Sequence, residues 1–217
     1  MGDEPERIWD EYDWERFLQQ QDRKTERYME LLEKYMDDPN RDAIIAREMG
    51  WHHLLDEEEV EDIDAGFAEE MKALEAEAIE QCADEISEGN DTFEMHPLYQ
   101  ASFELTVWID QLFDELGDLQ NHPAAVKLAT QSAIASAKLA AALSDDDVDE
   151  LGMTIAYLKR ALKAVSNAME AGAQLKKEIN LSNERHAALN HRLFQIRDRV
   201  ITLMGEYRAE WRRRYGV

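Results

Sequence analysis

Three side chains near residue 50 have types and spacing that could hold a divalent metal ion. Glu48, His52 and Asp56 follow one another at four-residue intervals, so an uninterrupted helix would place all three on one face. Carboxylate and imidazole groups are the usual metal ligands of helical bundles. Gly50 lies inside this stretch and predicts a helix end there. We therefore expect neither a metal ion nor an organic cofactor. If a metal ion is bound, these three residues are the candidate ligands.

A second group of residues could carry catalysis. Arg185 is followed by His186 and, six residues after Arg185, by His191. This pattern resembles the Arg-x(4–6)-His motif of the HEPN family (higher eukaryotes and prokaryotes nucleotide-binding), all-α bundles that often dimerise and include ribonucleases. The resemblance covers seven residues and implies that Arg185 stabilises a phosphate and His191 transfers a proton. His186 lies three residues before Leu189, which also fits a hydrogen-bonded histidine at the core edge.

Aromatic and charged side chains at the two ends of the chain predict an interaction surface. The acidic opening contributes Trp9, Tyr12 and Trp14, and the closing segment contributes Trp211, Arg212, Arg213 and Arg214. Such segments can meet through ion pairs and cation–π contacts. The favoured interpretation is that the aromatic residues anchor the N-terminal helix on its own bundle. The alternative is a dimer or partner interface, where Trp, Tyr and Arg commonly dominate.

The chain is strongly acidic, and the acidity is concentrated in its first part. The 217 residues carry a net charge of −24, with 30 acidic and nine basic residues in 1–90 against 18 and 15 in 91–217. Nucleic acid and membrane surfaces are therefore disfavoured partners, because both attract basic proteins. No apolar run is long enough to span a membrane, the opening is not a signal sequence, and there is a single cysteine, Cys82. These features predict a cytoplasmic protein.

The sequence of residues 1–90 predicts an acidic helical extension. The sequence predicts a helix from about Glu6 to Met36, a short helix after Pro39 that ends at Gly50, and an acidic helix from Asp56 to Ser87. The segment from Glu88 to Asp91 is the best linker. We therefore divide the chain into an extension, 1–90, and a second domain, 91–217.

Residues from about 96 to 214 predict an all-α, up-and-down bundle of four helices. His96-Pro97 and His122-Pro123 mark two helix starts at which the histidines should act as turn or capping residues, and Ser144 is expected to cap the third helix. Leucine-rich seams with steps of three and four follow each start. Nine of the 20 residues 124–143 are alanine, so we expect that helix to be buried on more than one side.

The sequence thus favours a non-enzymatic helical scaffold or interaction protein that self-associates through its bundle or its N-terminal segment. A homo-oligomer or a protein partner is expected, with no nucleic acid and no membrane. The alternatives are a HEPN-like ribonuclease that uses Arg185 and His191, and a metal-binding bundle.

Overall fold

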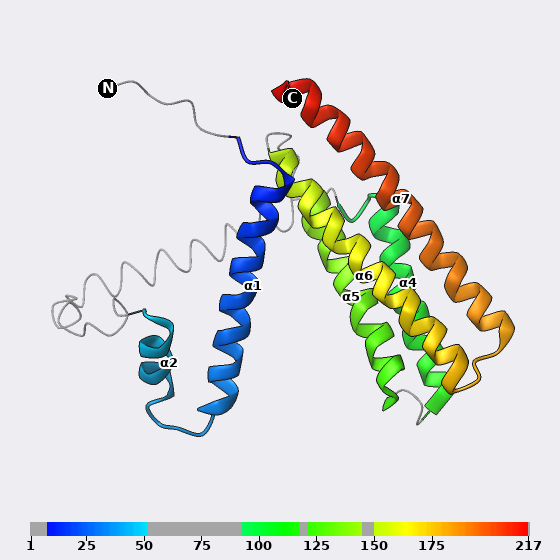
Figure 1. The fold of residues 1–217 in the computed structure, drawn as a ribbon. Helices are drawn as coiled ribbons and strands as arrows, with labels where there is room; N and C mark the ends of the chain where they lie inside the picture. The colour runs from blue at the N-terminus through cyan, green and yellow to red at the C-terminus, as the bar shows by residue number, and fades with distance from the viewer. Residues whose placement is uncertain (1–7, 52–92, 118–120, 145–149, 217) are drawn as a thin grey trace, which may run out of the picture. The chain divides into compact units, whose positions relative to one another are not determined.

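The computed structural model of the chain describes residues 8–51, 93–117, 121–144 and 150–216. Every regular element in these ranges is a helix and none is a strand, which confirms the predicted all-α class (Figure 1). The described residues fall into two compact units. The core unit contains residues 8–15 and those from 93 onward, and the second unit contains residues 16–51. The predicted domain division near residue 90 remains a prediction, because residues 52–92 lie outside the described ranges.

The core unit is built on four helices, α4 (Pro97–Leu116), α5 (Pro123–Leu143), α6 (Leu151–Glu178) and α7 (Asn183–Tyr215). Consecutive helices pack against each other, and α7 also contacts α4 (Figure 1). Apolar side chains from all four helices are buried between them, including Leu105, Ile109, Leu128, Leu139, Leu158, Val165, Leu193 and Ile196. These positions repeat at intervals of three and four residues, so each helix turns one apolar stripe inward. No described helix is both long and apolar enough to cross a membrane.

Two histidines begin helices in the predicted way. His96 precedes Pro97, and its Nδ1 accepts a hydrogen bond of 3.2 Å from the backbone N–H of Leu98. His122 precedes Pro123, and its Nδ1 accepts a bond of the same length from Ala124 N–H. In both helices proline takes the first position, where no N–H is needed. The predicted capping role of both residues is confirmed.

The prediction for Ser144 was wrong. Its backbone is helical, and its hydroxyl donates a 2.5 Å hydrogen bond back to the carbonyl oxygen of Ala140, so Ser144 ends α5 instead of starting α6. Glu150 precedes the first residue of α6 and makes no side-chain cap. A serine hydroxyl can bond to the preceding turn as readily as to the following one, so residue type alone does not fix the direction.

Small residues let α6 approach its neighbours closely. Ala135 of α5 and Ala161 and Ala168 of α6 are all buried in the common core. Toward α7, a Cβ atom on Gly172 would lie 2.8 Å from Cδ2 of Leu189. Because short side chains fill these contacts, the helix backbones pack nearer to each other than leucine or phenylalanine would allow.

The second unit pairs two helices, α1 (Glu11–Lys34), whose first turn belongs to the core unit, and α2 (Arg41–Met49). Leu31 of α1 and Ile45 of α2 are buried. The rings of Tyr28 and Trp51 lie 5.8 Å apart. Gly50 ends α2 in the left-handed conformation, with φ of 75°, as its position in the sequence predicted.

Candidate interaction surfaces

The metal-ligand candidates lie at the end of the second unit. Glu48 forms an ion pair of 3.1 Å with Arg27, and α2 stops at Met49, four residues after Ile45. His52 and Asp56 lie outside the described residues. Within the described ranges, no three His, Cys, Asp or Glu side chains form a group that could hold a metal ion. Metal binding by the trio therefore stays an untested alternative.

The two residues of the HEPN-like motif lie on the same continuous helix, α7, but on different sides of it. His191 lies six positions after Arg185 in the helix, which turns their side chains roughly 120° apart. The Arg185 guanidinium donates a hydrogen bond to the carboxylate of Glu115 on α4, whereas His191 is exposed. His186 is half-buried, with the Asn190 amide nitrogen 3.3 Å from its Nε2. The arrangement does not direct Arg185 and His191 of one chain toward a common phosphate.

The acidic and aromatic residues near the N-terminus form a compact structure, residues 8–15, which we call the N-terminal anchor. Asp10 caps α1, because its Oδ1 accepts hydrogen bonds of 2.8 Å from the backbone N–H groups of Tyr12 and Asp13. In turn, the backbone N–H of Asp10 donates a longer hydrogen bond of 3.4 Å to Oδ2 of Asp13. The indole rings of Trp9 and Trp14 meet edge to face at 4.9 Å. This local structure gives the anchor a defined shape.

Glu11 is the central contact between the anchor and the helices of the core unit. Arg208 of α7 donates two hydrogen bonds to its carboxylate, at 3.0 and 2.7 Å, and the Lys159 ammonium of α6 lies 3.4 Å away. Only 14% of the Glu11 side chain is exposed. Burial alone would raise the pKa of Glu11, but the hydrogen bonds and charges of Arg208 and Lys159 outweigh it and lower that pKa. Glu11 is therefore held as a carboxylate.

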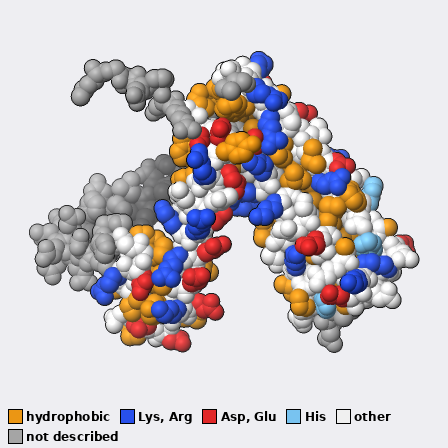
Figure 2. All heavy atoms as spheres, viewed as in Figure 1, with side chains coloured by type: hydrophobic (Ala, Val, Ile, Leu, Met, Phe, Trp, Pro, Cys, Tyr) orange, Lys and Arg blue, Asp and Glu red, His pale blue; other side chains and the backbone are white. Residues whose placement is uncertain are grey.

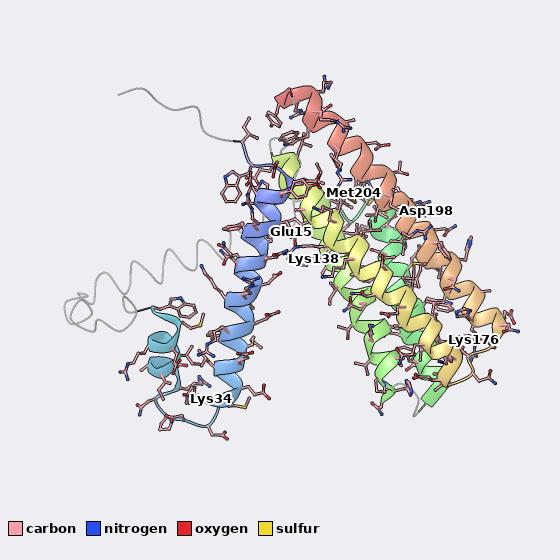
Figure 3. The ribbon with its side chains drawn as sticks, viewed as in Figure 1. Glu15, Lys34, Lys138, Lys176, Asp198 and Met204 are labelled. Atoms are coloured by element: carbon pink, nitrogen blue, oxygen red, sulfur yellow. The ribbon has the colours of Figure 1, made fainter. Side chains whose placement is uncertain are left out.

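Two further contacts join the anchor to α6. The Arg160 guanidinium donates to both carboxylate oxygens of Glu15, at 3.1 and 3.4 Å, with 13% and 23% of the two side chains exposed (Glu15 is labelled in Figure 3). The Lys159 ammonium lies 4.5 Å from the centre of the Tyr12 ring. Forked pairing and a cation–π contact are both directional, so they fix the register of the anchor along α6.

Gly152, near the start of α6, makes room for the anchor. A Cβ atom at this position would lie 2.5 Å from the carbonyl oxygen of Trp9 and 2.9 Å from Cδ1 of Trp14. No side chain fits at such distances, and one of the two obstacles is backbone. Gly152, Lys159, Arg160 and Arg208 together form what we call the anchor site.

The Arg-rich end of α7 forms ion pairs within its own helix. Arg213 and Arg214 pair with Glu210 on their own helix, and these hydrogen bonds lower the pKa of Glu210 to about 2. The cation that reaches Glu11 is Arg208, one turn earlier. Trp211 packs edge to face on Tyr215 at 5.5 Å, and its buried indole N–H has no hydrogen-bond partner among the described residues. An interaction role for Arg212, Arg213 and Arg214 stays a prediction.

A hollow of about 280 Å³ lies beside the contact between the end of α7 and the N-terminal anchor. It is lined by Asp10, Glu11, Tyr12, Ile155, Arg208, Trp211 and Arg212. Two of the predicted interaction residues, Tyr12 and Trp211, therefore come together here, as do Glu11 and Arg208. Trp9 and Trp14 do not line this hollow; the Trp9 carbonyl oxygen and the Trp14 ring lie against Gly152.

The outward side of α5 is the second candidate surface. Val126, Thr130, Ala133, Ile134 and Ala137 are all exposed, and we call them the α5 outer face. Val126 is 51% exposed and Ile134 38%. The alanine-rich composition predicted burial on more than one side; α5 packs against both α4 and α6, and its outward side stays exposed among the described residues. Contiguous apolar patches larger than a few hundred Å² are rarely left exposed on monomeric proteins and often mark interaction sites.

An apolar ridge on α4 adjoins the α5 outer face. Ser102 of α4 and Ser136 of α5 share a hydrogen bond of 3.3 Å, and the exposed residues Phe103 and Ala137 follow them directly. The Phe103 ring stacks on that of Tyr99 at 6.2 Å, and Val107, one turn further along, is 41% exposed. We call Tyr99, Phe103 and Val107 the α4 ridge.

Sequence reasoning missed most of the anchor site. Gly152, Lys159 and Arg160 are spaced by seven and eight residues, which places them on one side of a helix, and this side is distinct from the leucine seam. The signal available in the sequence was a glycine inside a predicted helix, where no turn requires one, followed by two cations on the same side of that helix. This combination indicates that another segment packs closely there. No known family model, curated protein sequence or solved structure matches the chain.

Proposed function

We propose that the protein is a non-enzymatic helical scaffold that self-associates through the α5 outer face, with α4–α7 forming an up-and-down four-helix bundle. The observation that carries this proposal is an exposed helix side without charge. The only charged residues of α5 are Lys127 and Lys138, and neither belongs to the outer face. One residue in three of the whole chain is charged, so a solvated side of a 21-residue helix would be expected to carry several charges.

The available surface is of the size that specific dimers use. A helix of 21 residues is about 31 Å long. Two adjacent helices such as α4 and α5 present a face roughly 20 Å across, since neighbouring axes lie about 8–10 Å apart. The resulting plane area is on the order of 600 Å², near the roughly 800 Å² that each partner contributes to a standard interface. Small residues at positions 133 and 137 allow a second helix to approach closely.

Charge supports a second copy of the same chain as the occupant. Lys127 and Lys138 lie on the α6 side of α5, where Lys127 pairs with Glu170 at 2.7 Å. On the other flank of α5, along α4, the exposed acids Asp110 and Asp114 lie two turns after Phe103 and Val107, on the same side of the helix. A two-fold axis parallel to α5 places the α4 side of each copy opposite the α6 side of the other. Acids then face lysines, whereas an antiparallel pair would set like charges against each other.

The test is the oligomeric state in solution. The wild-type chain is expected to be a dimer by sedimentation equilibrium, and Ile134→Glu should weaken the dimer at least about 100-fold, because it buries an unpaired charge at the centre of the face. Ile201→Glu is the matched control, since Ile201 is 51% exposed on α7 and should leave the dimer intact. A monomeric wild type would reject self-association. In that case a loss of stability in Ile134→Glu would indicate that the face is covered within the chain itself.

A charge exchange tests the orientation of the two copies. Lys127→Glu should weaken the dimer, and adding Asp110→Lys and Asp114→Lys in the same chain should restore it, because the opposing charges are then reversed together. Failure of this rescue, with Ile134→Glu still effective, would reject the parallel arrangement but keep the surface.

The HEPN-like ribonuclease and the metal-binding bundle remain alternative predictions without a structural observation that favours them. If the purified protein cleaves RNA and His191→Ala cleaves equally well, the role assigned to His191 is excluded. Absence of stoichiometric metal in elemental measurements of the purified chain would count against the second alternative.

A further inference from the structure

We propose that the exposed surface formed by the C-terminal part of α1 and the turn after it, in the second unit, binds a basic amphipathic helix of another protein. The surface consists of Glu26, Met29, Glu30, Glu33 and Met36, which we call the acidic methionine face. This inference does not rest on the self-association proposed above, because the two surfaces belong to different units.

The acidic methionine face has the shape of a shallow helix-binding surface. Its five residues and Leu32 line a hollow of about 550 Å³. Met29 is 56% exposed and Met36 60%. Met29 lies on α1 and Met36 lies in the turn that follows Lys34, the last residue of the helix, whereas Leu31 is buried in the same unit. Figure 2 shows acidic side chains beside hydrophobic ones around this end of α1.

The chemistry of the face selects a basic and apolar partner. All ionisable groups that line the hollow are glutamates. Glu30 has a weak pairing with Arg27 at 3.8 Å, and both side chains are more than half exposed, so water screens the pair and leaves Glu30 available. Methionine side chains are flexible and polarizable, and they adapt to differently shaped apolar groups. An amphipathic helix with Lys or Arg flanking apolar residues at positions i, i+3/i+4 and i+7 matches both features.

Two occupants from the chain itself fit less well. Residues 52–90 hold 15 acidic residues and one lysine, so they carry the same negative charge as the face and would be repelled by it. The basic end of α7 is the other possibility, but three of its cations already have partners: Arg208 binds Glu11, and Arg213 and Arg214 bind Glu210. A helix of a different protein meets the charge requirement without breaking these pairs.

The experiment uses the full chain and a fluorescently labelled Lys/Leu amphipathic peptide of about 18 residues, or about five helical turns. Fluorescence anisotropy should show saturable binding that weakens as salt rises. Met29→Ser/Met36→Ser should weaken binding about tenfold or more through lost apolar contact. Glu26→Lys/Glu33→Lys should weaken it at least as much. The variant Ile134→Glu should bind like the wild type.

Matched controls separate a specific site from the general attraction of an acidic chain. Glu104→Lys/Glu206→Lys makes the same change in net charge at exposed positions of α4 and α7, and it should leave binding nearly unchanged. A peptide of equal charge with serine in place of leucine should bind at least tenfold more weakly. Equal losses in the two charge variants, or no loss in the methionine variant, would overturn the proposal. Competition by an unlabelled peptide of residues 194–214 as strong as that by the unlabelled Lys/Leu peptide would point instead to a second copy.

Discussion

Arg208 and Glu11, 197 residues apart in sequence, are joined by two hydrogen bonds of 3.0 and 2.7 Å between guanidinium and carboxylate. Since 39% of the Arg208 side chain is exposed, water screens part of this interaction. We expect a coupling free energy of about 1 kcal/mol from a double-mutant cycle of Glu11→Ala and Arg208→Ala, measured by urea unfolding. Arg213→Ala is the control, because Arg213 is 74% exposed and should change stability by less than about 0.5 kcal/mol. Independent, additive effects of Glu11 and Arg208 would contradict the pairing.

The lowered pKa of Glu11 predicts a specific loss of stability in acid. The folded chain holds Glu11 ionised below its ordinary pKa of 4.5, so the unfolded chain takes up the proton first as pH falls. The contribution of Glu11 is therefore complete above about pH 4.5 and disappears as pH falls through the lowered folded value. Glu11→Gln should remove this part of the pH dependence, because glutamine does not titrate. Parallel stability curves of the two proteins from pH 6 down to about pH 3 would show that Glu11 has no such role.

His96 predicts a second pH dependence at higher pH. Burial, and then the positive charge of Arg199, lower the pKa of His96 below its ordinary value of 6.5. The neutral ring caps α4, whereas the unfolded chain protonates His96 more readily, so the cap contributes fully above pH 6.5 and less as pH falls toward the folded value. His96→Ala should cost about 1 kcal/mol at about pH 8, and this cost should shrink near pH 5.5. His96→Asn retains a cap that does not titrate, so it should stay near wild-type stability at pH 8.

The sequence predicted the helical class and the inward stripes because these depend on local periodicity. Leu105 and Ile109 of α4, or Leu193 and Ile196 of α7, lie at helical spacing and are buried as that spacing requires. The capping role of His96 was predictable for the same reason, since proline favours the first position of a helix and the residue before it is then placed to cap the following turn.

Contacts between distant segments were not predictable in the same way. The sequence indicated that an acidic, aromatic opening would meet a basic helix end, but it did not select Arg208 over Arg212, four residues later. That choice depends on the direction in which α7 presents each side chain to α6 and to the anchor. Arg160 was missed because it lies outside the seam of α6, and its partner Glu15 is 145 residues away.

Gly152 gives the most direct test of the N-terminal anchor. In Gly152→Ala the added methyl group would lie 2.5 Å from the Trp9 carbonyl oxygen and 2.9 Å from Cδ1 of Trp14, so the anchor must move away from α6. We expect backbone amides of residues 11–15 to exchange with deuterium faster than in the wild type, since release of the anchor exposes the first turn of α1.

The matched control is Gly205→Ala on α7, where the added methyl group would meet no atom within 4 Å apart from its chain neighbours and the backbone of its own helix. Alanine favours a helix interior over glycine by about 0.5–1 kcal/mol, so Gly205→Ala should leave exchange in residues 11–15 unchanged and stabilise the chain slightly. The two substitutions are chemically identical and differ only in what the methyl group meets. Equal exchange rates in the anchor of both variants would show that Gly152 is not the point at which the anchor is held.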